Sequence, residues 1–253
     1  MTSDTQAGTG SAPTRLGFLI PQLNVMCESE FPRRVPEGVS CHFTRLPRRG
    51  SQMQGDDLVG MMLNAPDHAE LLKRIDVRVI MCACTSGTFF GDTPQVDELA
   101  HRVADRTGIP SFTTSCAVVD ALAAVKARSV YMLTPYPLDI ADQEIRFLDH
   151  YGFRVSASYS FECAESRQVR ELGADRVRRA LLEDRAAVEQ ADAVFLSCTN
   201  MQTMDVLTEL EEVFDRPVIS SNSATLWRAM AAAGCNFEDV QCGRLFRLPH
   251  EEN

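Results

Sequence analysis

The chain has 253 residues, a formal net charge of −10 and a pI near 5.0, and 45% of its residues are hydrophobic. This composition is typical of a globular protein, and the acidic balance argues against binding to nucleic acid or to an anionic membrane surface. No apolar stretch approaches the roughly 20 residues that a membrane-spanning helix needs.

Residues 1–14 are small and polar and have no hydrophobic segment of the kind a secretory signal requires. We therefore expect a flexible tail over 1–14 and a cytoplasmic protein. The chain has nine cysteines, an odd number, and no sign of export, so we expect reduced thiols. Cys82 and Cys84 form a C-x-C pair without an accompanying His/Cys spacing, which argues against structural zinc.

Strand-like and helix-like segments alternate along the chain. In the first half we expect strands at 15–21, 39–46 and 77–83, and helices after 21, over 55–75 with a break near Pro66, over 93–108 and, after the segment PSFTTS at 110–115, over 117–127. In the second half we expect strands at 129–135, 153–161, 192–198 and 217–222, and helices over 137–152, 175–191, 204–214 and 223–234.

Alternating strands and helices predict parallel sheets with crossover helices. The two halves also correspond, because Cys84 and Cys198 are separated by 114 positions, as are Gly38 and Gly152. We therefore predict an α/β fold of two similar lobes, each a parallel sheet flanked by helices, related by pseudo-two-fold symmetry. The first lobe would comprise 15–118 plus 225–253, and the second 119–224.

Cys84 and Cys198 each end a hydrophobic strand and are followed by small polar residues and a helical segment. Ligands of open parallel sheets bind beyond the carboxyl ends of the strands. Backbone N–H groups at such a turn bind a carboxylate and lower the pKa of a thiol. If the lobes are symmetric, the two thiols face one another, which suits isomerisation or racemisation without a cofactor. The alternative for a single such cysteine is simple packing in the core.

The segments TRLGFLIPQLNVMCESEF, CACTSGT, LTPYPLDI and SCTNMQT resemble the maleate cis–trans isomerase branch of the aspartate/glutamate racemase superfamily, which includes arylmalonate decarboxylase. The resemblance covers nearly the whole chain after the tail. It implies that Cys84 is the nucleophile that adds to the substrate double bond and that Cys198 is its proton-donating partner. It also implies a homodimer, and it implies no metal, nucleotide or flavin.

The resemblance further implies a set of carboxylate-binding groups: Asn24, Thr85, Ser86, Tyr136 and Thr199, with the backbone N–H groups of Cys198 and Thr199. Each side chain has a structural alternative. Asn24, Thr85 and Ser86 could cap helices, and Tyr136 could cover a strand end. The basic segments PRRVPEG and LPRRG are interpreted as solvated loops. Gln22, Leu23 and Val25 replace the small polar residues of the family pattern and make the entry bulkier and more apolar. The substrate is therefore open, and a different or larger acid is an alternative to maleate.

Four functions stay open from the sequence. The first is a cofactor-independent isomerase of a small dicarboxylate of the maleate type, which the CTSG, SCTN and Thr-Pro-Tyr motifs favour. The second is a two-thiol racemase of an acidic or derived amino acid from a catabolic pathway. The third is an arylmalonate-type decarboxylase, against which Cys84 argues, since that branch has glycine there. The fourth is a non-catalytic dicarboxylate binder.

Overall fold

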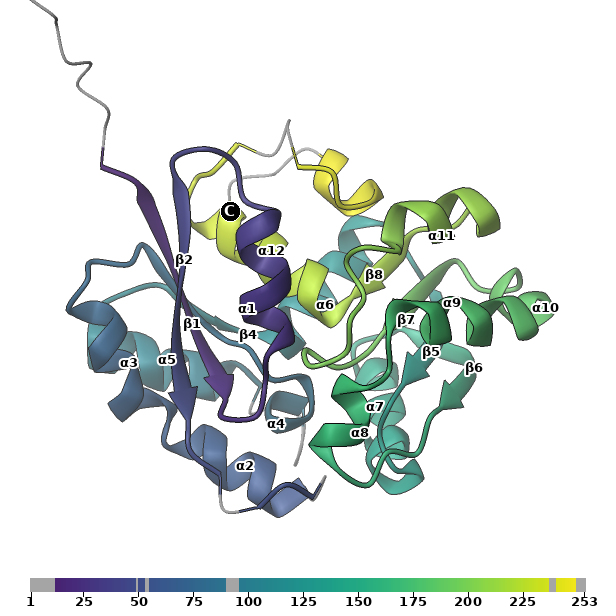
Figure 1. Ribbon diagram of the computed structural model, residues 1–253, viewed down its shortest axis with the longest axis horizontal. Coiled ribbons are helices and arrows are strands. Elements are labelled where there is room, and N and C mark those ends of the chain that lie inside the picture. The colour runs from purple at the N-terminus through teal and green to yellow at the C-terminus, as the bar shows by residue number, and fades with distance from the viewer. Residues whose placement is uncertain (1–11, 49, 53–54, 90–95, 237–239, 249–253) are drawn as a thin grey trace, which may run out of the picture.

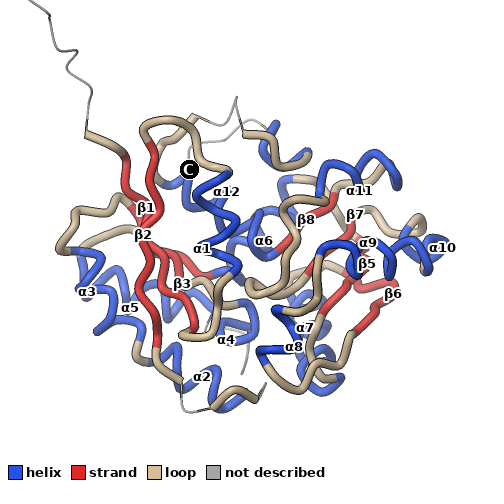
Figure 2. Tube along the Cα trace, viewed as in Figure 1, coloured by secondary structure: helices blue, strands red, loops and turns tan. Residues whose placement is uncertain are grey.

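The computed structural model describes residues 12–48, 50–52, 55–89, 96–236 and 240–248. Within these ranges the strands form two four-stranded sheets, which occupy separate lobes (Figures 1 and 2). Most of the predicted tail, residues 1–11, lies outside the described residues, and Thr14 already belongs to the first strand.

Both sheets are parallel and share one strand order. The first has the order β2-β1-β3-β4, from β1 (Thr14–Pro21), β2 (Val39–Leu46), β3 (Val79–Cys82) and β4 (Ser111–Thr113). The second has the order β6-β5-β7-β8, from β5 (Ser129–Thr134), β6 (Arg154–Ser160), β7 (Ala193–Leu196) and β8 (Val218–Ser220). The predicted duplication of an α/β lobe is therefore confirmed.

Burial explains the sequence character of each strand. The central strands β3, β5 and β7 are buried along their whole length, and they are accordingly almost continuous runs of apolar residues. The edge strands β2 and β6 are partly exposed and carry alternating polar residues. Gly38 and Gly152 precede these edge strands with φ angles of 81° and 85°, so the same left-handed turn starts both, and glycine is the residue that adopts it readily.

Helices connect the strands. In the first half of the chain these are α1 (Met26–Glu30), the 3₁₀ helix η1 (Phe31–Arg33), α2 (Gly55–Leu63), α3 (Ala65–Lys73), α4 (Thr85–Phe89), α5 (Val96–Thr107) and α6 (Thr114–Ala124). In the second half they are α7 (Leu138–His150), α8 (Ser166–Arg170), α9 (Ala174–Glu183), α10 (Arg185–Val188), α11 (Leu207–Phe214), α12 (Ser221–Ala232) and the 3₁₀ helix η3 (Arg244–Arg247).

Helices α6 and α12 pack against each other between the lobes (Figure 1). Each also contacts strands of both sheets: α6 touches β4 and β8, and α12 touches β3 and β8. A single large core cluster consequently runs through both lobes. The predicted lobe boundaries at 118/119 and 224/225 fall inside these two helices, so the division into lobes stays a prediction.

Some elements differ from their predicted bounds. The helix predicted over 175–191 is interrupted at Asp184, which has φ −105° and ψ 28° and joins α9 to α10. The helix predicted from 223 begins at Ser221, because Ser220 caps it and forms a capping box with Ser223. The predicted break near Pro66 is confirmed, since α3 starts with proline in its first turn, and α8 was not predicted. Residues 93–95 of the predicted helix lie outside the described residues.

None of the described helices has the length and apolar character needed to span a membrane.

Candidate active site

A cleft of about 370 Å³, its open mouth included, lies between segments that follow the strands of the two sheets. The segments of the first sheet contribute Pro21, Asn24, Arg48, Leu58, Cys84, Thr85 and Ser86, and those of the second contribute Tyr136, Ser166, Val169, Cys198, Thr199 and Asn200. Every residue predicted for the site therefore lines one cleft. The structure brings together groups separated by more than 170 positions in the chain, as Asn24 and Thr199 illustrate.

Cys84 lies two residues beyond β3, directly before the short helix α4. Its side chain is 4% exposed. Burial raises the pKa of the Cys84 thiol, and three groups oppose this: the backbone N–H of Gly87, the side chain of Ser86 and the charge of Arg48. The small residues of the CTSG motif thus surround the sulfur with groups that stabilise a thiolate.

Gly87 lies so close to Cys84 and Met62 that a larger residue there would require these side chains to shift. A Cβ atom added there would lie 3.1 Å from the Cys84 sulfur and 2.7 Å from the Cγ atom of Met62. The CTSG motif predicted the turn at Cys84, but no role was predicted for Gly87. The signal was present in the motif, since a glycine inside a helical turn beside a strand end is typical of close packing.

Cys198 occupies the equivalent place after β7, but its backbone has φ 106°, a strained value for a residue with a side chain. The strained turn is anchored because the Cys198 N–H donates a hydrogen bond to the Ser221 Oγ atom over 3.0 Å. The expectation that the Cys198 N–H binds a substrate carboxylate is therefore not met, because this N–H donates to Ser221.

The environment of Cys198 keeps its thiol protonated. Burial raises the pKa of Cys198 to about 12, and the charges of Cys84 and Glu144 act in the same direction. The Asn200 backbone and the Tyr136 side chain, which are both hydrogen-bonded to Cys198, oppose this effect. The two thiols consequently differ: the groups around Cys84 include a full positive charge, and those around Cys198 include a carboxyl group.

Asn24 and Thr199 join the two halves of the site. The Asn24 side chain donates to the Thr199 Oγ1 atom over 3.1 Å, and Thr199 in turn donates to the Ala83 carbonyl over 3.3 Å. Asn24 also accepts a hydrogen bond from the Cys27 N–H in the first turn of α1, although the N-cap residue of this helix is Val25. One N–H of its amide remains for a further acceptor.

Thr85 and Tyr136 also have partners within the protein. The Thr85 hydroxyl donates to Ser221 over 2.8 Å. Tyr136 is 1% exposed, and its hydroxyl is hydrogen-bonded to Cys198; burial raises the pKa of this phenol well above its usual value. Tyr136 is therefore a proton-bearing group at the second thiol and does not merely cover the strand end.

Arg48 lies in the wall of the cleft, which the sequence did not predict. The LPRRG segment was interpreted as a solvated loop, but Arg48 is half-buried and lines the cleft. Its Nη2 atom donates to Ser166 Oγ over 3.3 Å and its Nε atom to the Gly50 carbonyl over 2.8 Å. No pattern in the sequence distinguishes it from its basic neighbours, because only the folded chain brings it next to Cys84.

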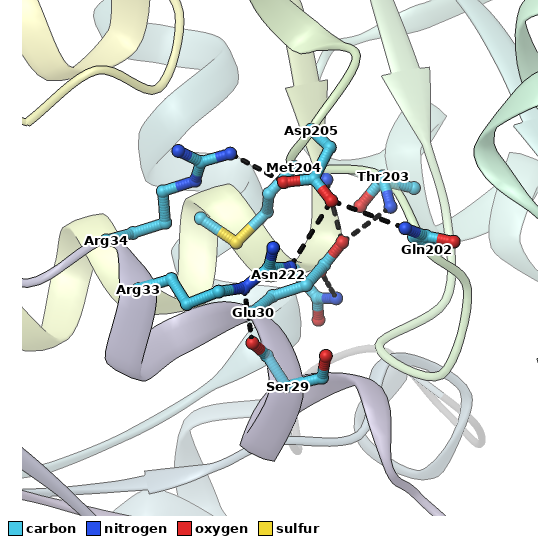
Figure 3. Close-up of polar contacts among 9 residues, drawn as sticks. All are labelled: Ser29, Glu30, Arg33, Arg34, Gln202, Thr203, Met204, Asp205 and Asn222. Atoms are coloured by element: carbon cyan, nitrogen blue, oxygen red, sulfur yellow. Dashed lines mark hydrogen bonds and ion pairs between the residues drawn. The ribbon is translucent and has the colours of Figure 1, made fainter.

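Glu30 holds the loop after Cys198 in place (Figure 3). This buried residue of α1 accepts hydrogen bonds from the backbone N–H groups of Thr203 and Met204, over 2.8 and 2.9 Å, and from the Asn222 side chain over 2.5 Å. Burial raises the pKa of the Glu30 carboxyl, and these three donors act against that rise. Asn24 and Glu30 lie on the same short segment of the chain. Through Asn24 this segment contacts the start of the loop at Thr199, and through Glu30 it contacts the end of the loop at Thr203 and Met204.

Ion pairs reinforce the same contact at the surface. Arg33 and Arg34 both bind Asp205, over 3.3 and 2.6 Å (Figure 3). These pairs are partly exposed, so their contribution to the free energy of folding is small. The buried hydrogen bonds of Glu30 therefore hold the loop after Cys198 more strongly than these exposed ion pairs do.

Glu144 is a second buried carboxyl group near the site. It is 1% exposed, and the Ser197 hydroxyl donates to its Oε1 atom over 2.5 Å. Its Oε2 atom is buried and has no hydrogen-bond partner within the described residues. Burial raises the pKa of Glu144 from 4.5 to about 8, so the carboxyl group is mainly protonated at neutral pH.

All nine cysteines are free thiols, as expected from the sequence. The seven cysteines other than Cys84 and Cys198 do not line the cleft. Cys27 is the nearest to the site in its interactions, since its thiol donates to the Thr199 carbonyl over 3.6 Å. Across the described parts of the chain, no three His, Cys, Asp or Glu side chains gather in a way that would hold a metal ion.

Two parallel sheets of one strand order, with a thiol from each beside a shared cleft, define a two-lobed α/β fold of the aspartate/glutamate racemase type. The family model for arylmalonate decarboxylase matches residues 51–246. The chain belongs to this family. Among curated relatives, the arylmalonate decarboxylase of Bordetella bronchiseptica is 31% identical over 66% of this chain and 70% of that protein.

The maleate isomerases match over a greater length. That of Nocardia farcinica is 26% identical over 92% of this chain and 95% of its own. Its solved structure, bound to TRIS, has a TM-score of 0.85 at 24% identity and covers 92% of this chain and 98% of that chain. A cysteine-to-serine variant of the same enzyme, with a covalently bound succinylcysteine intermediate, also has a TM-score of 0.85, at 23% identity. The fold and the expected branch are confirmed, and an isomerase is the enzyme class that these relatives indicate.

Proposed function

We propose that this protein is a cofactor-independent cis–trans isomerase of a small unsaturated dicarboxylate of the maleate type. The observation that carries the proposal is the placement of two unlike thiols, Cys84 and Cys198, on the walls of one cleft. The maleate isomerases that match over most of the chain support the substrate class.

The roles of the two thiols follow from their surroundings. Cys84 is the nucleophile, because Gly87, Ser86 and Arg48 favour its thiolate against the effect of burial. Cys198 is the proton donor, because its thiol has a pKa raised to about 12 and stays protonated at neutral pH. A nucleophile and an acid in one site need opposite protonation states. The surroundings of Cys84 oppose the effect of burial with a positive charge, whereas the charge of Glu144 adds to that effect at Cys198, so Cys84 is the thiol that ionises more readily.

The reaction is balanced without a cofactor. The Cys84 thiolate adds to one alkene carbon, and the alkene electron pair moves to the neighbouring carbon, where the Cys198 thiol delivers its proton. The new C–C single bond then rotates. The Cys198 thiolate removes the proton again, the double bond re-forms, and the C–S bond breaks to release the Cys84 thiolate and the trans product.

The remaining polar groups of the cleft hold the carboxylates in this proposal. Asn24 uses its second amide N–H, and Tyr136 uses its hydroxyl beside Cys198. Thr85 and Thr199 donate their hydroxyl protons to Ser221 and to the Ala83 carbonyl and so support the thiol turns, and Ser86 completes the polar lining beside Cys84. Holding both carboxylates fixed relative to the sulfurs lets only the central bond rotate.

The test is to follow maleate by proton NMR with the wild-type protein and with Cys84→Ser and Cys198→Ser. We expect fumarate from the wild type and a loss of about three orders of magnitude or more in each variant, as is usual when a covalent nucleophile or its acid partner is removed. Intact mass should show a substrate adduct on Cys198→Ser but none on Cys84→Ser.

Cys235→Ser is the matched control, since this half-buried cysteine does not line the cleft. Its activity should equal that of the wild type. Conversion of maleate by Cys84→Ser at the wild-type rate would refute the proposed roles, and so would an adduct on a cysteine outside the cleft.

Two-thiol racemisation is the second candidate, because a thiol on each wall also suits removal and return of a proton at Cα. Incubation of single enantiomers of aspartate, glutamate and acylated diamino acids in deuterated water distinguishes the two. Deuterium at Cα with loss of optical activity identifies a racemase, and fumarate from maleate identifies the isomerase.

Decarboxylation is tested by CO₂ release from an arylmalonate. The expected homodimer stays a prediction.

A further inference from the structure

Arg48 is held firmly beside the cleft. Its backbone carbonyl accepts a hydrogen bond from the Gln22 side chain over 2.7 Å, and its guanidinium donates to Gly50 and Ser166. Gln22 is one of the residues that depart from the family pattern at the entry. Its hydrogen bond to the Arg48 carbonyl helps to position the segment that carries Arg48.

The segment after Arg48 crosses to the second lobe. The Ser166 N–H donates to the Ser51 carbonyl over 3.0 Å, and Gln52 forms an antiparallel bridge with Glu165. Arg48 and Ser166 are therefore brought together by backbone pairing between the lobes as well as by their own hydrogen bond. This double constraint fixes the guanidinium at one place in the cleft wall.

Arg48 is the charged side chain among the described residues that line the cleft, and no carboxylate is among them. The charge of Asp57, which does not line the cleft, also acts on Arg48. Hydrogen bonds to described residues use two of the five guanidinium N–H groups. The remaining N–H groups form a planar fork of the geometry that binds a carboxylate.

We propose that Arg48 pairs with one carboxylate of the substrate and thereby restricts this protein to dianionic acids. The inference rests on the proposed function and names the substrate class of the same site: an acid with a second carboxylate that reaches the Arg48 side of the cleft. A monoanion of the same shape leaves a half-buried guanidinium without its partner, which is unfavourable.

The experiment compares maleate with maleamate, its half-amide, as substrates of the wild type, Arg48→Gln and Arg48→Lys. For maleate, we expect Arg48→Gln to lower kcat/KM by about 10- to 100-fold, mainly through KM, since it removes a charge-assisted hydrogen bond. For maleamate the loss should be severalfold at most. Arg48→Lys should fall between the wild type and Arg48→Gln, because lysine keeps the charge but loses the fork.

Arg167→Gln is the control for net charge, since Arg167 follows Ser166 in sequence, is 76% exposed and does not line the cleft. It should discriminate maleate from maleamate as the wild type does. Equal losses on both substrates in Arg48→Gln, or unchanged discrimination, would overturn the proposal.

Binding measurements separate this proposal from the proposed function. Succinate and succinamate are not isomerised, so calorimetry on each measures binding without the reaction, and the comparison with Arg48→Gln isolates the Arg48 contact. We expect succinate to bind the wild type at least 10-fold tighter than succinamate, and Arg48→Gln to abolish this preference. If maleate is not isomerised but this preference is found, the proposed function fails and the Arg48 inference stands. If the wild type shows no preference, the Arg48 inference fails.

Discussion

Thr85 donates a hydrogen bond to Ser221 over 2.8 Å, and this contact connects the turns that carry the two thiols. The same Ser221 oxygen accepts the Cys198 N–H over 3.0 Å. The residue after one thiol is thus linked through a single hydroxyl group to the strained backbone of the other. The relative position of the two sulfurs depends on this bridge as well as on the packing of α6 against α12.

Ser221→Ala should therefore impair both catalysis and stability. The variant leaves the Thr85 hydroxyl and the Cys198 N–H without their acceptor, which costs about 1–3 kcal/mol in folding free energy. We expect kcat for the maleate reaction to fall about 10-fold or more, because an ångström-scale displacement of a reacting group has effects of that order. Steady-state kinetics and thermal unfolding measure the two effects.

Ser156→Ala is the matched control, since the Ser156 hydroxyl makes one hydrogen bond, to Val130 over 3.3 Å, and does not line the cleft. Its kcat should be that of the wild type. An unchanged kcat in Ser221→Ala would show that the bridge does not position the thiols.

Gly87→Ala tests the close approach to Cys84. The added methyl group would lie 2.7 Å from the Met62 Cγ atom, 3.1 Å from the Cys84 sulfur and 3.2 Å from the Leu58 carbonyl oxygen. Met62 must therefore move, and the sulfur must give by a few tenths of an ångström. We expect a loss of about 1–3 kcal/mol in stability from overpacking and at least a 10-fold fall in kcat/KM.

Gly60→Ala provides the comparison, because an added Cβ at Gly60 of α2 meets nothing within 4 Å. This control should be as stable as the wild type or more so, by up to about 1 kcal/mol, since alanine favours a helix. If both glycine variants keep full activity, the tight contact at Gly87 has no role in catalysis.

The pH dependence of the reaction should report the Cys84 thiolate. Since burial raises the pKa of Cys84, only a minor fraction is ionised at neutral pH, and kcat/KM should rise by up to tenfold per pH unit between pH 6 and pH 8. Cys198, with a pKa raised to about 12, should not contribute a descending limb below pH 10.

Alkylation by iodoacetamide, mapped by peptide mass spectrometry, should show the same pH dependence at Cys84. Arg48→Gln removes a positive charge that favours the thiolate, so it should move the rising limb to higher pH. A rate that is flat from pH 6 to pH 8 would mean that the thiolate is already formed at pH 6.

Glu144→Gln should change how stability depends on pH. In the folded protein the pKa of Glu144 is raised from 4.5 to about 8, so between these values the folded state keeps a proton that the unfolded state has lost. Wild-type stability from this group is therefore fully present below about pH 4.5 and declines as the pH rises to about 8. The total is on the order of a few kcal/mol, because one pKa unit corresponds to about 1.4 kcal/mol.

Glutamine does not titrate, so the difference in melting temperature between Glu144→Gln and the wild type should become more favourable to the variant from pH 5 to pH 8.5. A constant difference from the buried amide is expected at every pH and does not affect this trend. Thermal unfolding at several pH values measures it. A difference independent of pH would show that Glu144 is ionised throughout.

The strand and helix pattern was predictable because hydrophobic periodicity and turn residues are local properties. The apolar runs of β3, β5 and β7 mark strands buried on both faces, and the repeat of 114 positions between Cys84 and Cys198 reveals the duplication. The break at Asp184 and the short helix α8 were not visible, since each depends on what the segment packs against and not on its own composition.

By itself, the sequence determined the two-lobed α/β class, the pair of thiols and the polar residues around them, because each strand end carries its chemistry within a few positions. Only the tertiary structure decided which hydroxyl groups hold the lobes together, which charged and polar groups surround each thiol, and that Arg48 lines the cleft while the Cys198 N–H donates to Ser221. Burial, hydrogen bonding and charge at a site depend on residues far apart in the chain, and these meet only when the lobes pack.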